Sequence, residues 1–202
     1  MNPGILRERG EILTLSPLPG ENPLPGWEWK TDRKIWLSAK ETGKKNLFSG
    51  VGVGAAGVDI LMRETDLTLH NAIRWRGQHY FLTNIQEEGV HPVYYKVQAA
   101  RITPKTVTQY RMQMEIGEYN RPDNEYLPLQ TFPACITEKY VKSSDQDSHV
   151  ETEAQLAAVT PKVIEAKAGD LFEIEGKKYR VMTAHLQDEF KNEYVIQRTE
   201  ED

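Results

Sequence analysis

The sequence predicts an all-β protein of two tandem small antiparallel β-barrels with long loops. Three observations lead to this prediction: short runs of alternating apolar residues, glycine turns between neighbouring runs, and a self-similarity between the two halves. The stretch W-R-G-Q-H-Y-F-L-T-N-I from Trp75 is similar to I-E-G-K-K-Y-R-V-M-T-A from Ile174, and Gly77 and Gly176 differ by 99 positions (176 − 77). Self-similarity at a fixed period indicates a repeated structural unit.

The same separation relates other parts of the two halves. Residues 95–98 fall on 194–197, 35–39 on 134–138, and 11–15 on 110–114, and the Pro-bearing loop at Asn22-Pro23 falls on Arg121-Pro122. We therefore predict a duplication without a gap, with domains at 1–104 and 105–202. The predicted boundary lies at Thr103-Pro104-Lys105, where proline interrupts the strand pattern.

Each half contains six predicted strands. Their ranges are 10–15, 33–41, 58–64, 72–76, 79–85 and 93–99 in the first half, and 108–115, 132–141, 158–165, 171–175, 178–184 and 193–198 in the second. The pairs Phe172/Ile174 and Tyr179/Val181 show the period of two typical of strands. Gly77 and Gly176 supply the positive φ of a tight hairpin turn. A short helix is possible within 150–158. Such strands make a small barrel or a sandwich.

Composition suits a soluble globular protein, with 39% hydrophobic and 27% charged residues and a net charge of −5. No apolar run approaches the roughly 20 residues that cross a bilayer, and the N-terminus lacks a signal-peptide core, so we expect an intracellular protein. Residues 1–104 carry 13 Lys and Arg against 11 Asp and Glu (net +2), and residues 105–202 carry 12 against 19 (net −7). The single cysteine, Cys135, is expected in the core.

The two halves differ most in the loop after the second predicted strand. In the first half its glycines and apolar side chains predict a segment that orders on contact with a neighbouring chain. Its candidate residues are Lys44, Lys45, Leu47, Phe48, Gly50, Gly52, Gly54 and Gly57. The motif G-x-G-x-x-G at 52–57 is not read as a nucleotide site, because a strand pattern follows it. The corresponding loop of the second half is acidic, through Asp145, Asp147, Glu151 and Glu153.

The sequence also offers tryptophans, acidic residues and histidines as candidate site residues. Trp27 and Trp29 lie in a predicted Pro-rich loop as possible interface anchors, whereas Trp36 is expected in the core. The acidic residues of the second loop lack the glycine turn of a calcium loop, so a solvated or interface role is favoured. The five histidines lack metal-ligand spacing, and no nucleophile motif is present. We therefore expect no enzyme activity, cofactor or metal.

Four segments of the first half form one pattern: M-N-P-G-I-L-R-E-R-G-E-I-L, K-I-W-L-S-A-K-E-T-G, V-D-I-L-M-R-E-T-D-L-T-L and I-R-W-R-G-Q-H-Y-F-L-T-N-I. This pattern resembles the head-closure, or head-tail adaptor (stopper), family of tailed bacteriophages. Trp36, Gly43, Arg63, Gly77 and Tyr80 match the family pattern. It covers about residues 1–103; the chain is about twice the family's usual length, and its second half is interpreted as a diverged copy.

The resemblance implies a virion neck protein, made in the host cytoplasm and located at the head-tail interface. It implies a homo-oligomeric ring between a portal or adaptor above and a tail terminator or tail tube below. Viral DNA would pass through it without sequence-specific binding, and the loop at 44–57 would face the channel. Because each chain offers two barrels, a hexamer is favoured and a dodecamer is the alternative. The free chain is expected to be a monomer.

Two other functions stay open from the sequence. One is a different ring-forming tail component, such as a tail terminator. The other is a nucleic-acid-binding tandem barrel of the OB or SH3-like type, which would need a basic aromatic groove. No membrane association is expected.

Overall fold

The computed structural model describes residues 3–19, 24–45, 55–88, 93–116, 122–144, 150–186 and 190–199. A short 3-10 turn at Pro3–Ile5 precedes the strands. The strands are β1 (Glu8–Pro17), β2 (Trp27–Lys45), β3 (Ala55–Arg63), β4 (Ala72–Trp75), β5 (Gln78–Glu88), β6 (Tyr94–Ile102), β7 (Pro104–Ile116), β8 (Pro122–Ser144), β9 (Val150–Pro161), β10 (Leu171–Ile174), β11 (Lys177–Leu186) and β12 (Lys191–Arg198).

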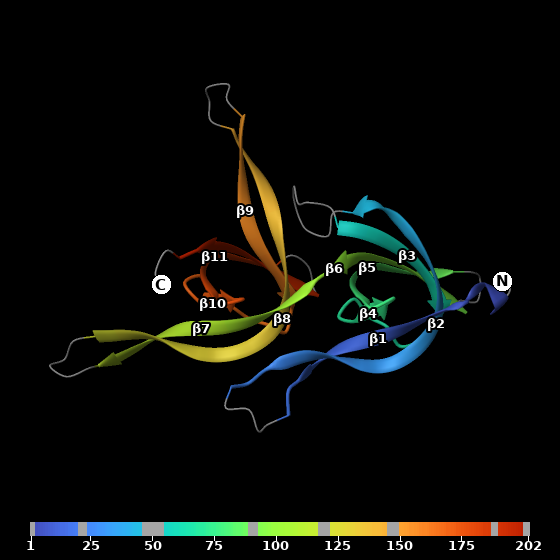
Figure 1. Cartoon of the computed structure of the whole chain (residues 1–202), viewed down its shortest axis with the longest axis horizontal. Helices are drawn as coiled ribbons and strands as arrows, with labels where there is room; N and C mark the ends of the chain where they lie inside the picture. Colours follow the sequence, from blue (N-terminus) through green and yellow to red (C-terminus); the bar gives the residue numbers. More distant parts are fainter. Residues whose placement is uncertain are drawn as a thin grey trace. The chain divides into compact units, whose positions relative to one another are not determined.

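The strands form two closed antiparallel barrels with the same order. In the first barrel the order is β1-β2-β3-β6-β5-β4, and in the second it is β7-β8-β9-β12-β11-β10, each closing on itself (Figure 1). Closure leaves the central part of each strand paired on both sides, which protects the backbone hydrogen-bonding groups. The predicted fold class of two tandem small barrels is confirmed.

By their contacts, the chain divides into two compact units. The first unit contains residues 1–16 and 29–103, and the second contains residues 17–28 and 104–202. The end of β1 at Pro17 and the start of β2 at Trp27 and Glu28 therefore belong to the second unit, although they precede the rest of that unit in the sequence.

The separation between equivalent residues is 99 only at the β4–β5 hairpin. Trp75 pairs with Gly10, and its equivalent Ile174 pairs with Val107, so β1 and β7 are 97 positions apart (107 − 10). The other registers give 97 for β2/β8 and β6/β12, and 98 for β3/β9. The predicted gap-free offset of 99 was therefore wrong outside that hairpin, because connecting segments of the two halves differ by one or two residues.

Turn geometry repeats between the barrels. Arg76 and Gly77 have φ of 48° and 74°, and Glu175 and Gly176 have φ of 52° and 75°. Two consecutive residues with positive φ are typical of the type I′ hairpin turn, whose twist matches the flanking strands. The predicted positive φ at Gly77 and Gly176 is confirmed. A β-bulge also repeats, between Leu82 and Asn84 in β5 and between Val181 and Thr183 in β11.

The two cores fill equivalent positions with different side chains. The first barrel packs Ile35, Ile73 and Val97 where the second packs Phe132, Phe172 and Tyr194, whose rings meet edge to face. The reverse exchange occurs at three other buried positions, where Leu37, Ile60 and Met62 are replaced by Ala134, Ala158 and Thr160. Because interiors are close-packed, a gain in side-chain volume at some positions requires a loss at others. This compensation explains how the fold persists at low sequence identity.

Several element predictions need correction. Trp27 and Trp29 lie in β2, which begins six residues before its predicted start, and not in a Pro-rich loop. The possible helix within 150–158 was wrong, because these residues belong to β9. The strands around both variable loops are longer than predicted, because β2 and β8 continue to Lys45 and Ser144. Pairing with β3 and β9 favours the extended backbone there over the local sequence pattern.

Substitution of either turn glycine should destabilise its barrel. Gly77→Ala and Gly176→Ala place a side chain at a positive φ, which costs about 1–2 kcal/mol in the left-handed region. Urea unfolding monitored by circular dichroism measures this loss. Gly43→Ala is the matched control, since no atom lies within 4 Å of the added Cβ, and it should be neutral or stabilising by up to about 1 kcal/mol. Equal losses at Gly43 and Gly77 would contradict the turn assignment.

Candidate functional site

The outer face of the first barrel carries an exposed aromatic and basic surface. Trp36 is 48% exposed, and the Arg9 guanidinium lies 3.6 Å from its ring centroid. The expectation that Trp36 lies in the core was wrong, because its neighbours Ile35 and Leu37 take the inward positions of β2. Exposed Trp and Arg together are typical of the centre of a binding surface.

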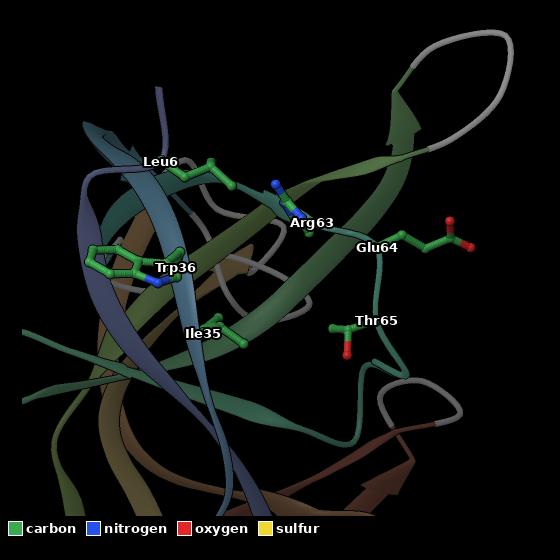
Figure 2. A pocket seen from close by; sticks show the side chains of 6 residues that line it. All are labelled: Leu6, Ile35, Trp36, Arg63, Glu64 and Thr65. Atoms are coloured by element: carbon green, nitrogen blue, oxygen red, sulfur yellow. The ribbon is translucent and has the colours of Figure 1, made fainter. Parts of the chain in front are cut away.

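A shallow pocket of about 410 Å³ adjoins Trp36. It lies beside β2 and the segment that leaves β3, as Figure 2 shows. Its lining residues are Leu6, Ile35, Trp36, Arg63, Glu64 and Thr65. The Arg33 guanidinium donates to the Thr65 hydroxyl at 2.8 Å, which joins β2 to this segment. The lining combines the apolar Leu6, Ile35 and Trp36 with the charged Arg63 and Glu64, which suits a protein segment better than a small polar ligand.

Ion pairs next to this face are reversed in the second barrel. Arg76 pairs with Glu8 at 2.9 Å in the first barrel, and the equivalent Glu175 pairs with Lys105 at 2.9 Å in the second. Arg74, which pairs with Glu11, has Glu173 as its equivalent. The Arg76–Glu8 contact is preserved while its polarity changes, and the β4–β5 hairpin carries Arg74 and Arg76 where the β10–β11 hairpin carries Glu173 and Glu175.

The same four-residue turn precedes β4 in the first barrel and β10 in the second. In each turn, the side chain of the fourth residue accepts a hydrogen bond from the backbone N–H of the first residue. Asn71 accepts from Thr68 and Asp170 accepts from Lys167, each at 2.9 Å. In the first barrel, Asn71 also donates to the Thr14 hydroxyl at 3.1 Å. The same turn therefore holds an amide in one barrel and a carboxylate in the other.

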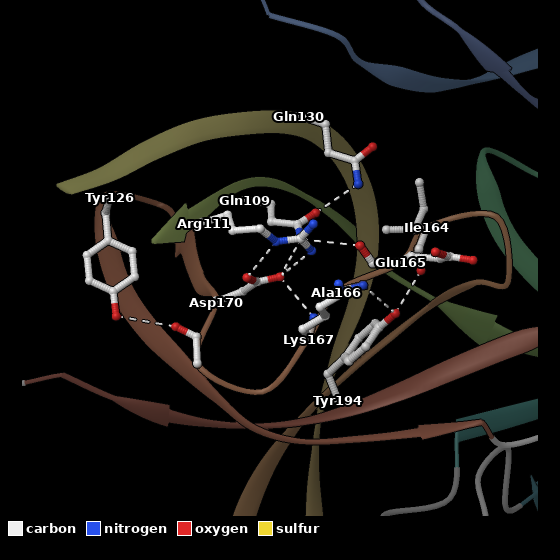
Figure 3. Close-up of polar contacts among 11 residues, drawn as sticks. Gln109, Arg111, Tyr126, Gln130, Ile164, Glu165, Ala166, Lys167, Asp170 and Tyr194 are labelled. Atoms are coloured by element: carbon white, nitrogen blue, oxygen red, sulfur yellow. Dashed lines mark hydrogen bonds and ion pairs between the residues drawn. The ribbon is translucent and has the colours of Figure 1, made fainter. Parts of the chain in front are cut away.

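Asp170 forms an ion pair with an arginine side chain, whereas its equivalent Asn71 forms a hydrogen bond with a threonine hydroxyl. Arg111, the equivalent of Thr14, donates to Asp170 through Nε at 3.0 Å and Nη2 at 2.9 Å. Gln109, which replaces the core residue Ile12, is fully buried and donates to Asp170 at 2.7 Å. Gln130 then donates to Gln109 at 2.8 Å. Figure 3 shows these contacts converging on the Asp170 carboxylate.

The electrostatics of Asp170 follow from this cluster. Burial pushes the pKa of Asp170 upward, but hydrogen bonds from Arg111, from the Lys167 backbone and from Gln109 outweigh burial and lower the pKa. Arg111 responds in the opposite direction: its hydrogen bond to Asp170 raises the pKa of the guanidinium. Both groups are charged at neutral pH, and both carboxylate oxygens accept bonds from the protein. The cluster therefore stabilises the loop before β10; it offers no reactive group to a substrate.

The described part of the β1–β2 tip (residues 17–19 and 24–28) contacts β8 next to this cluster. The Thr131 N–H donates to the Pro25 carbonyl at 2.9 Å, and Gly26 forms a parallel bridge with Thr131. The Trp27 indole donates to Gln130 at 3.1 Å. A Cβ at Gly26 would lie 2.6 Å from the Thr131 hydroxyl and 2.5 Å from Leu18. Glycine is therefore required for this close approach.

The remaining predicted site residues are dispersed. Lys44, Lys45 and Gly57 lie in the paired parts of β2 and β3. Glu151 and Glu153 lie in β9 opposite Ser143 and Val141. Leu47, Phe48, Gly50, Gly52, Gly54, Asp145 and Asp147 lie outside the described residues.

Other predicted features can be placed directly. The Trp29 ring packs edge to face on Phe81, with centroids 6.0 Å apart. Cys135 is buried, as predicted. Sequence reasoning missed the Gln109–Arg111–Asp170 cluster; the change from Asn71 to Asp170 at the repeat position was the available signal.

Across the part of the chain that the structure describes, no three His, Cys, Asp or Glu residues gather closely enough to bind a metal ion. No helix among these residues is long and apolar enough to span a membrane.

The chain belongs to the class of tandem proteins with two closed six-stranded β-barrels. Its distinctive features are the exposed surface at Trp36 and Arg9 and the hairpin contact at Thr131. No protein-family model, curated protein or solved structure matches the chain.

Removal of the Asp170 charge should destabilise the second barrel. Asp170→Asn loses an ion pair at a buried carboxylate, and hydrogen bonds to charged groups contribute about 1.5–3 kcal/mol. Urea unfolding at pH 7 measures the loss. The control Glu175→Gln removes an exposed ion pair and should cost less than about 1 kcal/mol.

The same variant gives a pH test. Because its pKa is lowered on folding, Asp170 stabilises the fold fully above the unfolded pKa of about 3.9, and the stabilisation is lost as pH falls through the folded pKa. Asp170→Asn should flatten the dependence in this acidic range. An unchanged pH dependence in the variant would contradict the assignment.

Gly26→Ala should detach the β1–β2 tip from β8. The added methyl group would meet the Thr131 side chain and Leu18, so the bond from the Thr131 amide to Pro25 should open. Hydrogen exchange at the Thr131 amide should become at least about tenfold faster, whereas Gly43→Ala should leave it unchanged. Continued protection of Thr131 in Gly26→Ala would show that the contact tolerates a side chain.

Proposed function

We propose that the chain is a structural neck protein of a tailed bacteriophage, which forms a ring between the head and the tail. The single observation that carries the proposal is the repeat of one closed barrel, with the same strand order, turn and bulge, within one chain. The first barrel resembles the head-closure family, and a tandem copy adds a second assembly surface to each subunit.

The positions of the polar cluster and of the exposed aromatic side chain agree with the role of a connector. The most elaborate polar cluster among the described residues is satisfied internally at Asp170, whereas Trp36 and Arg9 are presented outward. A net charge of −5 per chain also suits a channel that transmits DNA without retaining it. In this role the β2–β3 hairpin, which includes Lys44 and Lys45, would line or close the channel.

A ring of six chains follows from the duplication. Six copies present twelve barrels, which allows a match to a twelve-fold ring on one side and a six-fold tail on the other. Portal or adaptor and tail terminator or tail tube are the proposed neighbours. A different ring-forming tail component is the nearest alternative within the same class.

A second candidate function is favoured by one observation. The exposed Trp36 with Arg9 and Lys34 supplies the basic aromatic surface that a nucleic-acid-binding barrel needs. Glu8 and Glu11 lie within the same surface and would repel phosphates. A salt-dependent mobility shift with single- or double-stranded DNA would favour this alternative over the connector.

Particles produced without this protein test the proposal. We expect filled heads that lose DNA and carry no tails, since both closure and tail attachment would be missing, and electron microscopy with a DNA-release assay measures both. Complementation with the intact gene is the control. Normal tailed particles without the protein would contradict the neck role. Twelve copies per neck in complemented particles would overturn the hexamer and leave the neck role standing.

A further inference from the structure

The contact of the β1–β2 tip with β8 shows how a strand edge of this barrel receives an extended segment. The Thr131 N–H donates to the Pro25 carbonyl at 2.9 Å, and Gly26 forms a parallel bridge with Thr131. The Trp27 indole donates to the Gln130 side chain at 3.1 Å. Because Thr131 lies outside the β8–β9 pairing, the tip covers an edge of β8 that β9 leaves unpaired.

The first barrel repeats this edge on β2. Since β2 and β8 are related by 97 positions, Lys34 is the equivalent of Thr131 (131 − 97) and Arg33 is the equivalent of Gln130. The β2–β3 pairing begins at Leu37, so Lys34 lies outside it. Gln130 and Thr131 are partly buried, whereas Arg33 and Lys34 are exposed. Within the residues that the structure describes, the edge is therefore covered in the second barrel and exposed in the first.

The segment that follows β3 leaves the backbone of this edge accessible. The Glu64 N–H donates to the Val93 carbonyl at 2.9 Å, so this N–H is directed to the start of β6 and not to β2. A side-chain hydrogen bond, from Arg33 to the Thr65 hydroxyl at 2.8 Å, joins the segment to β2. Exposed strand edges are ready sites for the addition of another strand.

The same edge adjoins the pocket of about 410 Å³. Ile35 follows Lys34 directly in β2, and Leu6 and Trp36 complete the apolar part of the pocket lining, as Figure 2 shows. An extended segment on the edge presents alternate side chains to opposite faces of the sheet. In strand addition, main-chain hydrogen bonds give affinity and pockets for alternate side chains give specificity. The edge and the pocket together therefore fit an extended protein segment.

We propose that the β2 edge at Lys34 binds an extended, acidic segment of a partner protein. A backbone carbonyl of the segment would accept from the Lys34 N–H, as Pro25 accepts from Thr131. A glycine of the segment would lie against Lys34, as Gly26 lies against Thr131. The inference goes beyond the neck role, within which the segment would belong to a protein of a neighbouring ring.

The side chains of the edge select an acidic segment. Where Gln130 accepts a hydrogen bond from the tip, Arg33 offers only donors. The partner must therefore place an acceptor there, and a carboxylate makes the strongest hydrogen bond with a guanidinium. The neutral Thr131 is likewise replaced by the cationic Lys34, and Arg63 adds a positive charge in the adjoining pocket.

Two carboxylates near the edge favour a protein segment over a nucleic acid. Asp32 accepts from Arg33 Nε at 2.7 Å, and Glu64 lines the pocket. Both would repel a continuous phosphate backbone, whereas a protein segment can place separate carboxylates against Arg33 and Lys34 alone. The Arg33 guanidinium has more N–H donors than its bonds to Asp32 and Thr65 use, so it can bind a further acceptor.

Glycine is required where the segment crosses Lys34. A Cβ at Gly26 would lie 2.6 Å from the Thr131 hydroxyl. The Lys34 side chain is longer than that of Thr131, so the same approach leaves no additional room at β2. We therefore expect the partner segment to carry glycine followed by an acidic residue, where the tip has Gly26 and Trp27.

A peptide of sequence E-L-P-G-E-E tests the proposal. It keeps the L-P-G order of the tip and replaces the following tryptophan with glutamate. Titrated to millimolar concentration into the full chain at low salt, it should shift the amide resonances of Lys34 and Ile35. At saturation it should slow hydrogen exchange at the Lys34 amide at least about tenfold. The same peptide with alanine in place of glycine should bind at least about tenfold more weakly.

Charge exchange gives an independent readout. Lys34→Glu should weaken binding of the acidic peptide at least about tenfold, and the peptide K-L-P-G-K-K should bind this variant more tightly than it binds the unmodified chain. Lys96→Glu makes the same charge change on exposed β6 and is the control, which should bind the acidic peptide as the unmodified chain does. Circular dichroism establishes that both variants are folded.

Binding without slower exchange at the Lys34 amide, equal binding of the alanine peptide, or unchanged binding by Lys34→Glu would each overturn the proposal. So would an oligothymidylate that slows this exchange more than the acidic peptide at equal concentration, because the edge would then be a nucleic-acid site. Protection of Lys34 that rises with protein concentration alone would overturn it in favour of a second copy. The neck role is tested separately, by the particles produced without the protein.

Discussion

Barrel closure is the constraint on which the rest of this structure depends. Six strands close only when the registers around the circle are mutually consistent, so a shift at one strand pair must be absorbed elsewhere. Between the two barrels, the shifts of 97, 98 and 99 positions satisfy this condition, since the same strand neighbours are kept throughout. Within that frame, core side chains can be substituted as long as the total interior volume is conserved.

The two barrels differ in three places while this closed frame is kept. Inside, aromatic residues of the second barrel replace aliphatic residues of the first, and alanines compensate for the added volume. At the loop before the fourth strand of each barrel, an amide became a carboxylate and its hydroxyl partner an arginine, which left the turn intact and added an ion pair. On the outside, β4 and β10 carry opposite charges. The outer faces have diverged in charge while the closed frame has not, as expected if the faces meet different neighbours.

The sequence predicted the existence of all twelve strands, because alternation and the two glycine turns are local signals. It did not predict where the long strands begin, since Trp27 and Trp29 are held in β2 by pairing that local sequence does not encode. Trp36 was expected in the core because the sequence showed no basic groove beside the tryptophans; strand alternation turns it outward instead, where Arg9 lies over its ring. The Asp170 cluster was missed because the assumed offset of 99 aligned Gln109 and Arg111 with the wrong residues of β1. Tip docking at Thr131 depends on backbone contacts between distant segments, which leave no sequence pattern.

Hydrogen exchange at equivalent amides of β4 and β10 tests the central claim most directly. The account predicts that the Ile73 and Phe172 amides are both protected, because closure pairs each of these strands on both sides. Exchange at the rate of an unfolded chain in either strand would contradict the claim that both barrels are closed.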